Sequence, residues 1–282
     1  SEIISAQKTR QEMLIWTDTS LHAMRFTGPP FTFGISMLAN NVSIIGPNAV
    51  TTVGDKVFWM DRENFYVYTG RIQVIPCTLL RYVFDDINLD QSFKCFAASN
   101  KMFDEVFWFY PTADSDEIDR YVKFNFTENT WDLGTLSRTA WTDYGIHNNP
   151  RGSGATDSVN YIYIHELGQN NDGSAMTSFI ESADFDLGDG DHFMFMSRVV
   201  PDISITDTSG DSSGTVDYIV KTRDYPGDSL VTNSTSSVTT TTQQSFVRAR
   251  SRQAVMRIQS ASTDLAWTLG DLRLDLRPDG RR

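Results

Sequence analysis

The stretch MLIWTDTSLHAMRFTG at residues 13–28 decides the fold, because its pattern returns along the chain. Close copies are VFWMDRENFYVYTG at 57–70 and VFWFYPTADSDEIDRYVKFNFTENTW at 106–131, with a weaker one, YIYIHELGQNNDGSAMTSFIESADFDLG, at 161–188. Each copy joins an aromatic strand, a polar turn and a second strand. Trp16, Trp59 and Trp108 lie 43 and 49 residues apart, and Tyr163 follows 55 residues later. A period in the forties of aromatic-rich hairpins is typical of β-propeller blades.

The turns between these strands support hairpins. The first two copies share a four-residue turn, at 17–20 and 61–64, and both end in Thr-Gly. Turn residues between aromatic and β-branched runs indicate a β-hairpin. Three or four blades do not obviously close a circle, since propellers typically have about 4–8. Either irregular segments supply the missing strands, or the chain is part of a longer protein.

The pattern changes near Asp184, where longer strands with polar turns replace the repeat. We therefore predict an all-β protein with partial or distorted β-propeller blades over residues 1–188. A small antiparallel β-sandwich-like domain of five or six strands is predicted over residues 189–282. In its last segment the apolar alternation shifts by one at Gly270, which indicates a bulge or a tight turn between two strands.

Composition bounds the class of protein. The chain has 282 residues with 40% apolar and 12% aromatic content, which is ordinary for a soluble, β-rich globular protein. Its sequence contains no apolar run of the roughly 20 residues that a membrane span needs, and no visible secretory signal. Cys77 and Cys95 are the only cysteines. We interpret them as buried free thiols, as expected for folding in a reducing cytosol.

Charge is unevenly distributed. The net charge of −12 argues against a protein that grips nucleic acid, because grip depends on basic side chains. From Phe246 to Arg282, however, eight arginines stand against four aspartates, so this segment is basic and the rest acidic.

Two alternating sets of arginines lie in this basic segment. Arg248, Arg250 and Arg252 fall on one face of a strand, and Arg273 and Arg277 alternate with aspartates. One interpretation is a solvated face with cross-strand ion pairs, each contributing roughly 0.2–1 kcal/mol. The other is a contact surface facing the acidic body of a neighbouring subunit, and these five arginines are our candidate inter-subunit residues.

The sequence predicts no catalytic residue, cofactor or metal site. His22, His147, His165 and His192 show no paired spacing for zinc. Asp184, Asp186, Asp189 and Asp191 are the best metal candidates, but the EF-hand pattern fails because Asp189 stands where the turn glycine belongs. The segment from Ser182 to Asp186 begins like a sialidase box without completing it. Ser153 lacks the glycine of a nucleophile elbow.

Taken together, several phrases resemble a known virion component. They are MLIWTDTSLHAMRFTGPPFTFG, GDKVFWMDRENFYVYTG, EVFWFYP, ESADFDLGDGD, SRVVPD and LRLDLRPDGRR. This combination is similar to the tail proteins of short-tailed double-stranded DNA bacteriophages known as nozzle, tail tubular protein B or DNA-stabilisation (hub) proteins. The resemblance runs over nearly the whole chain.

The resemblance implies a non-enzymatic structural protein of the virion tail, assembled in the bacterial cytoplasm. Its expected partners are further copies in a ring, typically a hexamer, and a tail adaptor ring. Fibres or a spike, and double-stranded DNA in transit through the channel, are also expected. Family members are often longer upstream, so the start near a first blade strand fits a C-terminal portion. The alternative from another class is a carbohydrate-binding or glycan-hydrolysing β-propeller.

Overall fold

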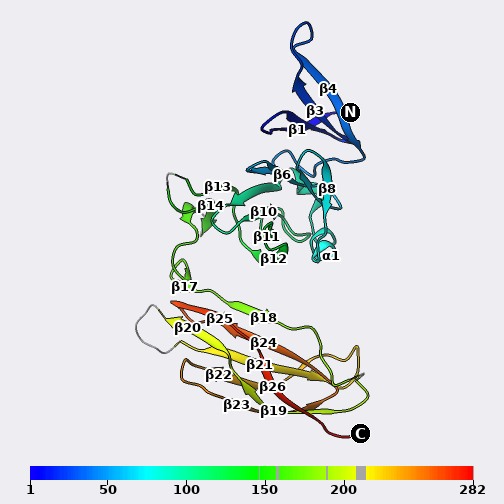
Figure 1. The fold of residues 1–282 in the computed structure, drawn as a ribbon. Helices are drawn as coiled ribbons and strands as arrows, with labels where there is room; N and C mark the ends of the chain where they lie inside the picture. Colours follow the sequence, from blue (N-terminus) through cyan, green and yellow to red (C-terminus); the bar gives the residue numbers. More distant parts are fainter. Residues whose placement is uncertain (146, 157–158, 189, 208–213, 282) are drawn as a thin grey trace. The chain divides into compact units, whose positions relative to one another are not determined.

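The computed structural model describes residues 1–145, 147–156, 159–188, 190–207 and 214–281 (Figure 1). The described chain is rich in strands and forms two compact units, Ser1–Leu167 and Gly168–Arg282. All strand pairs within its sheets are antiparallel, so the all-β class is confirmed. No helix in the described ranges has the length and apolarity to cross a membrane.

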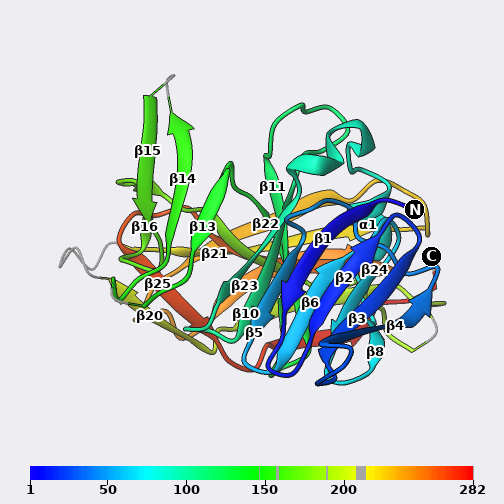
Figure 2. The ribbon, with the colours of Figure 1, turned by 90° about the horizontal axis from the view of Figure 1, so that it is seen from above.

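Unit 1 consists of four antiparallel sheets in chain order, named here sheets I to IV. Sheets I to III have four strands each, and sheet IV has three (Figure 2). The strands are β1 (Ile3–Lys8), β2 (Met13–Thr17), β3 (Ser20–Phe26) and β4 (Phe33–Asn40) in sheet I; β5 (Val50–Val53), β6 (Lys56–Met60), β7 (Phe65–Tyr68) and β8 (Ile72–Ile75) in sheet II; β9 (Phe96–Asn100), β10 (Glu105–Tyr110), β11 (Arg120–Asn125) and β12 (Thr130–Thr135) in sheet III; β13 (Ala140–Thr142), β14 (Arg151–Thr156) and β15 (Val159–Ile164) in sheet IV.

The first three copies of the repeated phrase form the second and third strands of sheets I to III. Trp16, Trp59 and Trp108 lie in β2, β6 and β10, each paired with the next strand, so these three hairpins are confirmed. The fourth copy was predicted to behave alike, and this prediction is wrong. Tyr163 lies in β15, the third strand of sheet IV, and the later part of the phrase joins unit 2. Aromatic alternation identifies a strand, but its partners decide its position in a sheet.

Sheets I to IV pack face to face in sequence. Trp16 of sheet I meets Trp59 of sheet II edge-on, with 5.4 Å between ring centroids. The other face of sheet II places Phe65 4.8 Å from Trp108 of sheet III. The other face of sheet III places Phe107 5.6 Å from Trp141 of sheet IV. Sheets II and III are therefore covered by aromatic side chains on both faces.

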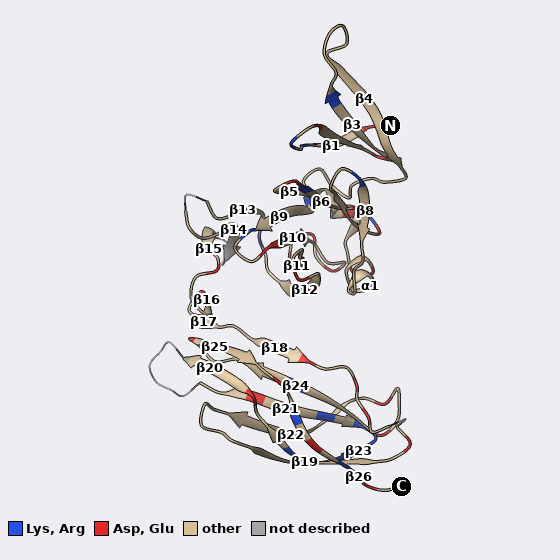
Figure 3. Ribbon diagram, in the orientation of Figure 1, with Lys and Arg blue, Asp and Glu red and all other residues tan. Residues whose placement is uncertain are grey.

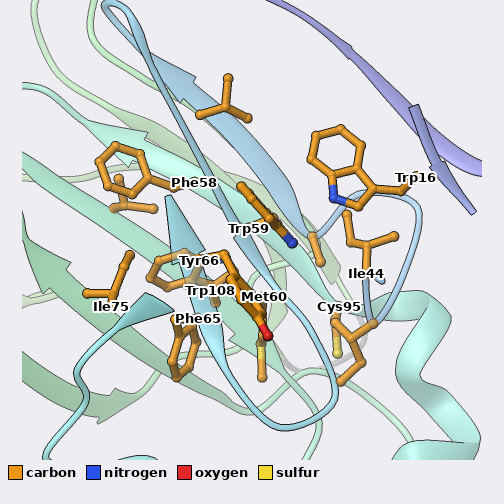
Figure 4. Packing of buried hydrophobic residues seen from close by; sticks show 14 of the residues in the cluster. Trp16, Ile44, Phe58, Trp59, Met60, Phe65, Tyr66, Ile75, Cys95 and Trp108 are labelled. Carbon is orange, nitrogen blue, oxygen red and sulfur yellow. The ribbon is translucent and has the colours of Figure 1, made fainter. Parts of the chain in front are cut away.

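The main core lies between sheets I, II and III (Figure 4). The side chains of Trp16, Trp59, Trp108 and Phe65 have no exposed surface there. Full burial of one large apolar side chain contributes about 1.5–3 kcal/mol, so this cluster is a main source of stability for unit 1. Ile44, which lies in a loop, belongs to the same buried cluster and lies near Trp16, as Figure 4 shows.

The first strands of the four sheets follow one another along one side of the series. β1 packs beside β5, β5 beside β9, and β9 beside β13. Gln7 Nε2 donates a 2.9 Å hydrogen bond to Thr52 Oγ1, and Trp141 Nε1 donates one of 3.0 Å to the Ser99 carbonyl. In the part of the chain that the structure describes these sheets are separate and open, and a closed circle of propeller blades is not confirmed.

The segment between sheets II and III contains two short helices, α1 (Leu80–Phe84) and the 3-10 helix η1 (Leu89–Lys94). Asn88 caps η1, because its side-chain oxygen accepts a 3.1 Å hydrogen bond from the Asp90 amide. Both cysteines are free thiols, as predicted, with Cys95 buried and Cys77 half-buried. Burial raises the pKa of Cys77 to about 11 and that of Cys95 to about 12.

Unit 2 is built around two sheets that share one core. Sheet V has the order β18-β24-β21-β22 and sheet VI the order β23-β19-β26, while β20 pairs with β25 and the short β16 with β17. Their bounds are β16 (Asn170–Asn171), β17 (Ser174–Ala175), β18 (Ser178–Glu181), β19 (Met194–Val200), β20 (Ile203–Asp207), β21 (Val216–Arg223), β22 (Val231–Val238), β23 (Ser245–Ser251), β24 (Gln253–Ser260), β25 (Leu265–Leu269) and β26 (Arg273–Pro278). Buried Met196, Tyr218 and Met256 belong to this core.

Unit 2 has more strands than the five or six predicted. Long apolar segments divide where the chain passes from one pairing to another, as at Pro201 between β19 and β20. Gly270 is such a point, because β25 pairs with β20 whereas β26 pairs with β19, so the turn alternative holds there. A Cβ atom at Gly270 would lie 2.7 Å from the Asp202 carboxyl carbon, so a larger residue there would require that side chain to move.

The division between the units falls before the predicted boundary at residue 188. Strand β18 pairs with β24, and Phe185 forms an isolated bridge with Ala254, so both belong to unit 2. Three of the phrases assigned to the blade region therefore carry sheets I to III, and the end of the fourth contributes an edge strand to unit 2.

Candidate functional site

The predicted arginine surface lies on sheet VI (Figure 3). In β23, Arg248 and Arg250 are exposed, whereas Val247 and Ala249 are buried. In β26, Arg273 and Arg277 are exposed and the leucines between them pack against the core. Alternation along a strand thus places the four arginines on the outer side, as the sequence predicts.

A phenylalanine lies between the arginines of the two outer strands. Phe195 of β19 lies opposite Arg250 of β23 on one side and Arg277 of β26 on the other. The Arg277 guanidinium carbon is 4.7 Å from the centre of the Phe195 ring. Such a cation–π contact contributes about 0.5–1 kcal/mol at exposed sites, so Phe195 helps to order Arg277, whereas Arg250 lies over the Phe193 ring at 4.1 Å.

Several of the arginines are paired within the chain. Arg250 Nε donates to Asp279 Oδ2 at 2.7 Å, and a 3.9 Å ion pair joins Arg273 to Asp202. Arg198, which the sequence analysis did not single out, pairs with Asp275 at 2.7 Å. These groups are substantially exposed, and such pairs contribute about 0–1 kcal/mol each. One of these pairs, Arg198–Asp275, joins neighbouring strands as the solvated-face interpretation expects.

Arg252 has a different environment from the other four arginines. It follows β23 and is half-buried, and its guanidinium donates to the carbonyls of Asp191 at 3.0 Å and Arg281 at 3.1 Å. Its guanidinium carbon also lies 4.8 Å from the Phe193 ring centre. These contacts connect three chain segments, which is a structural role. Among the described residues neither Arg248 nor Arg277 has an ion-pair partner, and Arg277 lies over Phe195, so Arg248 is the arginine most available to a neighbour.

The charge of the chain is segregated within unit 2. Unit 1 has 13 basic and 20 acidic residues, a net charge of −7. Unit 2 has 11 and 16, a net charge of −5, although its C-terminal segment is basic. Sheet VI is thus an arginine-bearing surface on a unit that is acidic as a whole. In the sequence, this contrast appears as one between a basic C-terminal segment and an acidic remainder of the chain.

Within the described ranges, the aspartates that the sequence offers as metal candidates, Asp184, Asp186 and Asp191, do not assemble a metal centre. Asp184 forms a 2.5 Å ion pair with Arg223. Asp189, one of the four candidates, lies outside the described residues. No group of three or more potential ligands gathers among the residues that the structure places.

A groove of about 500 Å³ lies among the first strands of all four sheets of unit 1. Its polar lining comes from Ser5, Gln7, Asn48 and Thr139, and Trp141 forms part of its wall. None of the residues that line it is ionisable. The groove can therefore offer hydrogen bonds and an aromatic surface, but neither a general acid nor a general base.

The most perturbed histidine, His165, follows sheet IV. Burial, and then the neighbouring Arg138 charge, lower the pKa of His165 to about 4. Arg138 Nε donates a 3.0 Å hydrogen bond to His165 Nε2, so this nitrogen is the acceptor and the neutral ring carries its proton on Nδ1. Arg138 also stacks on Tyr163 at 3.9 Å. The cluster of Arg138, Tyr163 and His165 holds the end of β15 in place. No motif or residue spacing in the sequence predicts this cluster.

No protein-family model and no curated protein matches this chain.

Proposed function

We propose that the chain is a structural protein of a short-tailed phage tail, which forms a nozzle or hub ring around the DNA-exit channel. It would retain the genome and then allow its release, together with an adaptor ring and other tail components. The proposal starts from the resemblance of the repeated phrases, the ESADFDLGDGD phrase and the RPDGRR terminus.

The observation that carries the proposal is the face-to-face series of sheets in unit 1. Aromatic side chains fill the spaces between consecutive sheets, from Trp16 against Trp59 to Phe107 against Trp141. Such a stack is a rigid scaffold that presents surfaces, which suits a ring subunit. The arginine surface of sheet VI supports it further, since two different patches must meet in a cyclic assembly.

Electrostatics are consistent with passage of DNA. Both units carry net negative charge, and an acidic or neutral channel lining lets a polyanion slide, whereas a lining of arginines would hold it. We therefore expect the arginines of sheet VI to face neighbouring subunits and an acidic or neutral surface to face the channel.

The glycan-hydrolysing alternative would need two facing carboxylates. The groove among the first strands has no ionisable residue in its described lining, so it lacks the groups for that reaction. A glycan-binding role would rest on Trp141 in the groove wall, whose ring is already packed against Phe107 and Phe109. We therefore place the structural role first.

The test is negative-stain electron microscopy with mass photometry on the purified protein, alone and with the adaptor protein. Closed rings with a central hole wide enough for duplex DNA are expected. Arg248→Glu with Arg250→Glu should weaken ring formation, and the loss should be largest at low salt because the contact is electrostatic. Absence of rings under both conditions, together with glycan binding abolished by Trp141→Ala, would refute the proposal.

A further inference from the structure

The outer face of sheet I is apolar. Strand register aligns Met24 of β3 with Met13 of β2 and with Ile35 of β4, and it aligns Phe26 with Phe33. Ile35 is 66% exposed, Phe26 70% and Phe33 57%. The face extends over all four strands, and its members are Ala6, Lys8, Met13, Ile15, His22, Met24, Phe26, Phe33, Ile35 and Met37. Lys8 is the only Lys, Arg, Asp or Glu among them.

This composition is that of a sheet covered on both sides. An antiparallel sheet with one face in water normally alternates apolar and polar side chains. In sheet I, Leu14, Trp16 and Leu21 on the inner face are buried, yet Met13, Ile15 and Met24 on the other face are also apolar. Sheets II and III have the same two-faced pattern and are covered on both faces. An exposed apolar face of this extent marks an interaction surface.

The opposite end of the series also has an uncovered face. Trp141, Gly152 and Tyr163 form one row of sheet IV, and Trp141 packs against sheet III. The residues of alternate parity therefore point the other way. These residues form the rows Ala140–Ser153–Ile162 and Thr142–Arg151–Ile164, in which Ile162 is 73% exposed and Ile164 50% exposed, so this face mixes apolar and polar side chains. Unit 1 thus has one uncovered sheet face at each end.

We propose that the outer face of sheet I in one copy packs against the outer face of sheet IV in a second copy of this chain. Inside unit 1 the rule is constant: each sheet offers one face to the preceding sheet and the other to the next. Joining sheet IV to sheet I of another copy continues that rule, and it brings a second β1 beside β13. One chain carries both halves of the contact.

The contact joins two different surfaces, so it is heterologous and builds rings or filaments. A four-strand-wide sheet face suits another sheet, since sheet faces stack about 10 Å apart with interdigitated side chains, and Ile162 and Ile164 give the sheet IV face apolar side chains for that contact. The inference does not depend on the phage assignment. If that assignment holds, this contact and the arginine surface are two separate contributions to the ring.

Two single substitutions test the pairing, Ile35→Lys on the sheet I face and Ile162→Lys on the sheet IV face. Val231→Lys is the matched control, since Val231 is 64% exposed on a strand of unit 2. Sedimentation velocity from about 1 to 100 μM, spanning micromolar affinities, measures association. Circular dichroism and thermal melting of each variant establish that it is folded.

The wild type and the Val231→Lys variant should associate with rising concentration. The Ile35→Lys variant alone and the Ile162→Lys variant alone should each remain monomeric. An equimolar mixture of Ile35→Lys and Ile162→Lys retains one intact pair of faces, so it should form a one-to-one complex that does not grow. Association of the wild type should persist at high salt, unlike an arginine-dependent contact.

A wild type that stays monomeric over this range would overturn the inference. The inference would also fail if the Ile162→Lys variant alone associated like the wild type, because the sheet I face would then pair with itself. These outcomes are separate from those of the ring experiment. Association through these faces without a DNA-sized ring would leave the contact standing and refute the proposed function.

Discussion

Replacing Trp59 by Phe should destabilise unit 1 more than replacing Trp16 by Phe, although both indoles are fully buried in one core. Trp59 Nε1 donates a 3.1 Å hydrogen bond to the Ser43 carbonyl. Trp16 Nε1 is buried and has no hydrogen-bond partner among the described residues. The two rings touch each other at 5.4 Å, so the packing environments are closely matched.

The expected difference follows from these polar atoms. Either substitution removes a similar ring volume, and a cavity costs about 24 cal/mol per Å³, so the packing losses are nearly equal. Trp59→Phe also loses a hydrogen bond worth about 0.5–1.5 kcal/mol. Trp16→Phe instead removes an unpartnered buried donor, whose burial costs about 1–3 kcal/mol. We expect Trp59→Phe to lower the free energy of unfolding by about 1.5–4.5 kcal/mol more than Trp16→Phe does.

Urea unfolding followed by tryptophan fluorescence measures this difference. Five of the six tryptophans lie in unit 1, so each variant keeps enough signal to follow that unit. Equal slopes of free energy against urea are needed for the comparison, since a changed slope indicates a changed denatured state. If Trp16→Phe cost as much as Trp59→Phe, the Trp16 indole would have a partner, such as a buried water, and the reasoning would be refuted.

Two further predictions concern the backbone and the pH response of unit 1. A Cβ atom at Gly46 would lie 2.5 Å from the Ser92 carbonyl oxygen, so Gly46→Ala should cost about 1–3 kcal/mol in urea unfolding. Gly145→Ala, where the added atom meets nothing within 4 Å, should change stability by less than about 0.5 kcal/mol. His165, whose pKa burial and Arg138 lower to about 4, is neutral when folded. The unfolded chain binds its proton near pH 6.5, so this stabilisation should be complete above that pH and lost as pH falls toward 4. Relative to His165→Asn, wild-type stability should fall by on the order of 2 kcal/mol between pH 7 and 4, and an unchanged difference would contradict the assignment.

Local pattern was sufficient where pairing partners are neighbours in the chain. The hairpins that contain Trp16, Trp59 and Trp108 were predictable because alternation and a short turn specify both strands and their register. Tyr163 was misplaced because YIYI also alternates, while its partner strand β14 is glycine-rich and has little aromatic signal. Gly152 stands where bulk is excluded, since a Cβ there would lie 2.9 Å from Arg138.

The arginine surface of sheet VI likewise has features that the local sequence pattern predicts and others that depend on long-range strand pairing. Alternation placed Arg248 and Arg250 on one side of a strand, and burial of the intervening Val247 and Ala249 agrees. Alternation gave no sign of Phe195, which lies between Arg250 and Arg277 only because β19 is the central strand of sheet VI. That order joins three segments far apart in sequence. The long-range partners Asp202 and Asp275 were hidden for the same reason.

The sequence by itself determined the all-β class, the first three hairpins and the side of each strand on which its arginines lie. These depend on a two-residue period and on turn chemistry, which act over a few neighbouring residues. Only the tertiary structure decided which sheet each later strand joins, and which sheet faces are covered. Strand pairing and burial are settled between distant segments competing for the same apolar surface, and the sequence of any one segment does not name its partner. The outer face of sheet I, with Ile35 and Phe33 exposed, is a consequence of that arrangement.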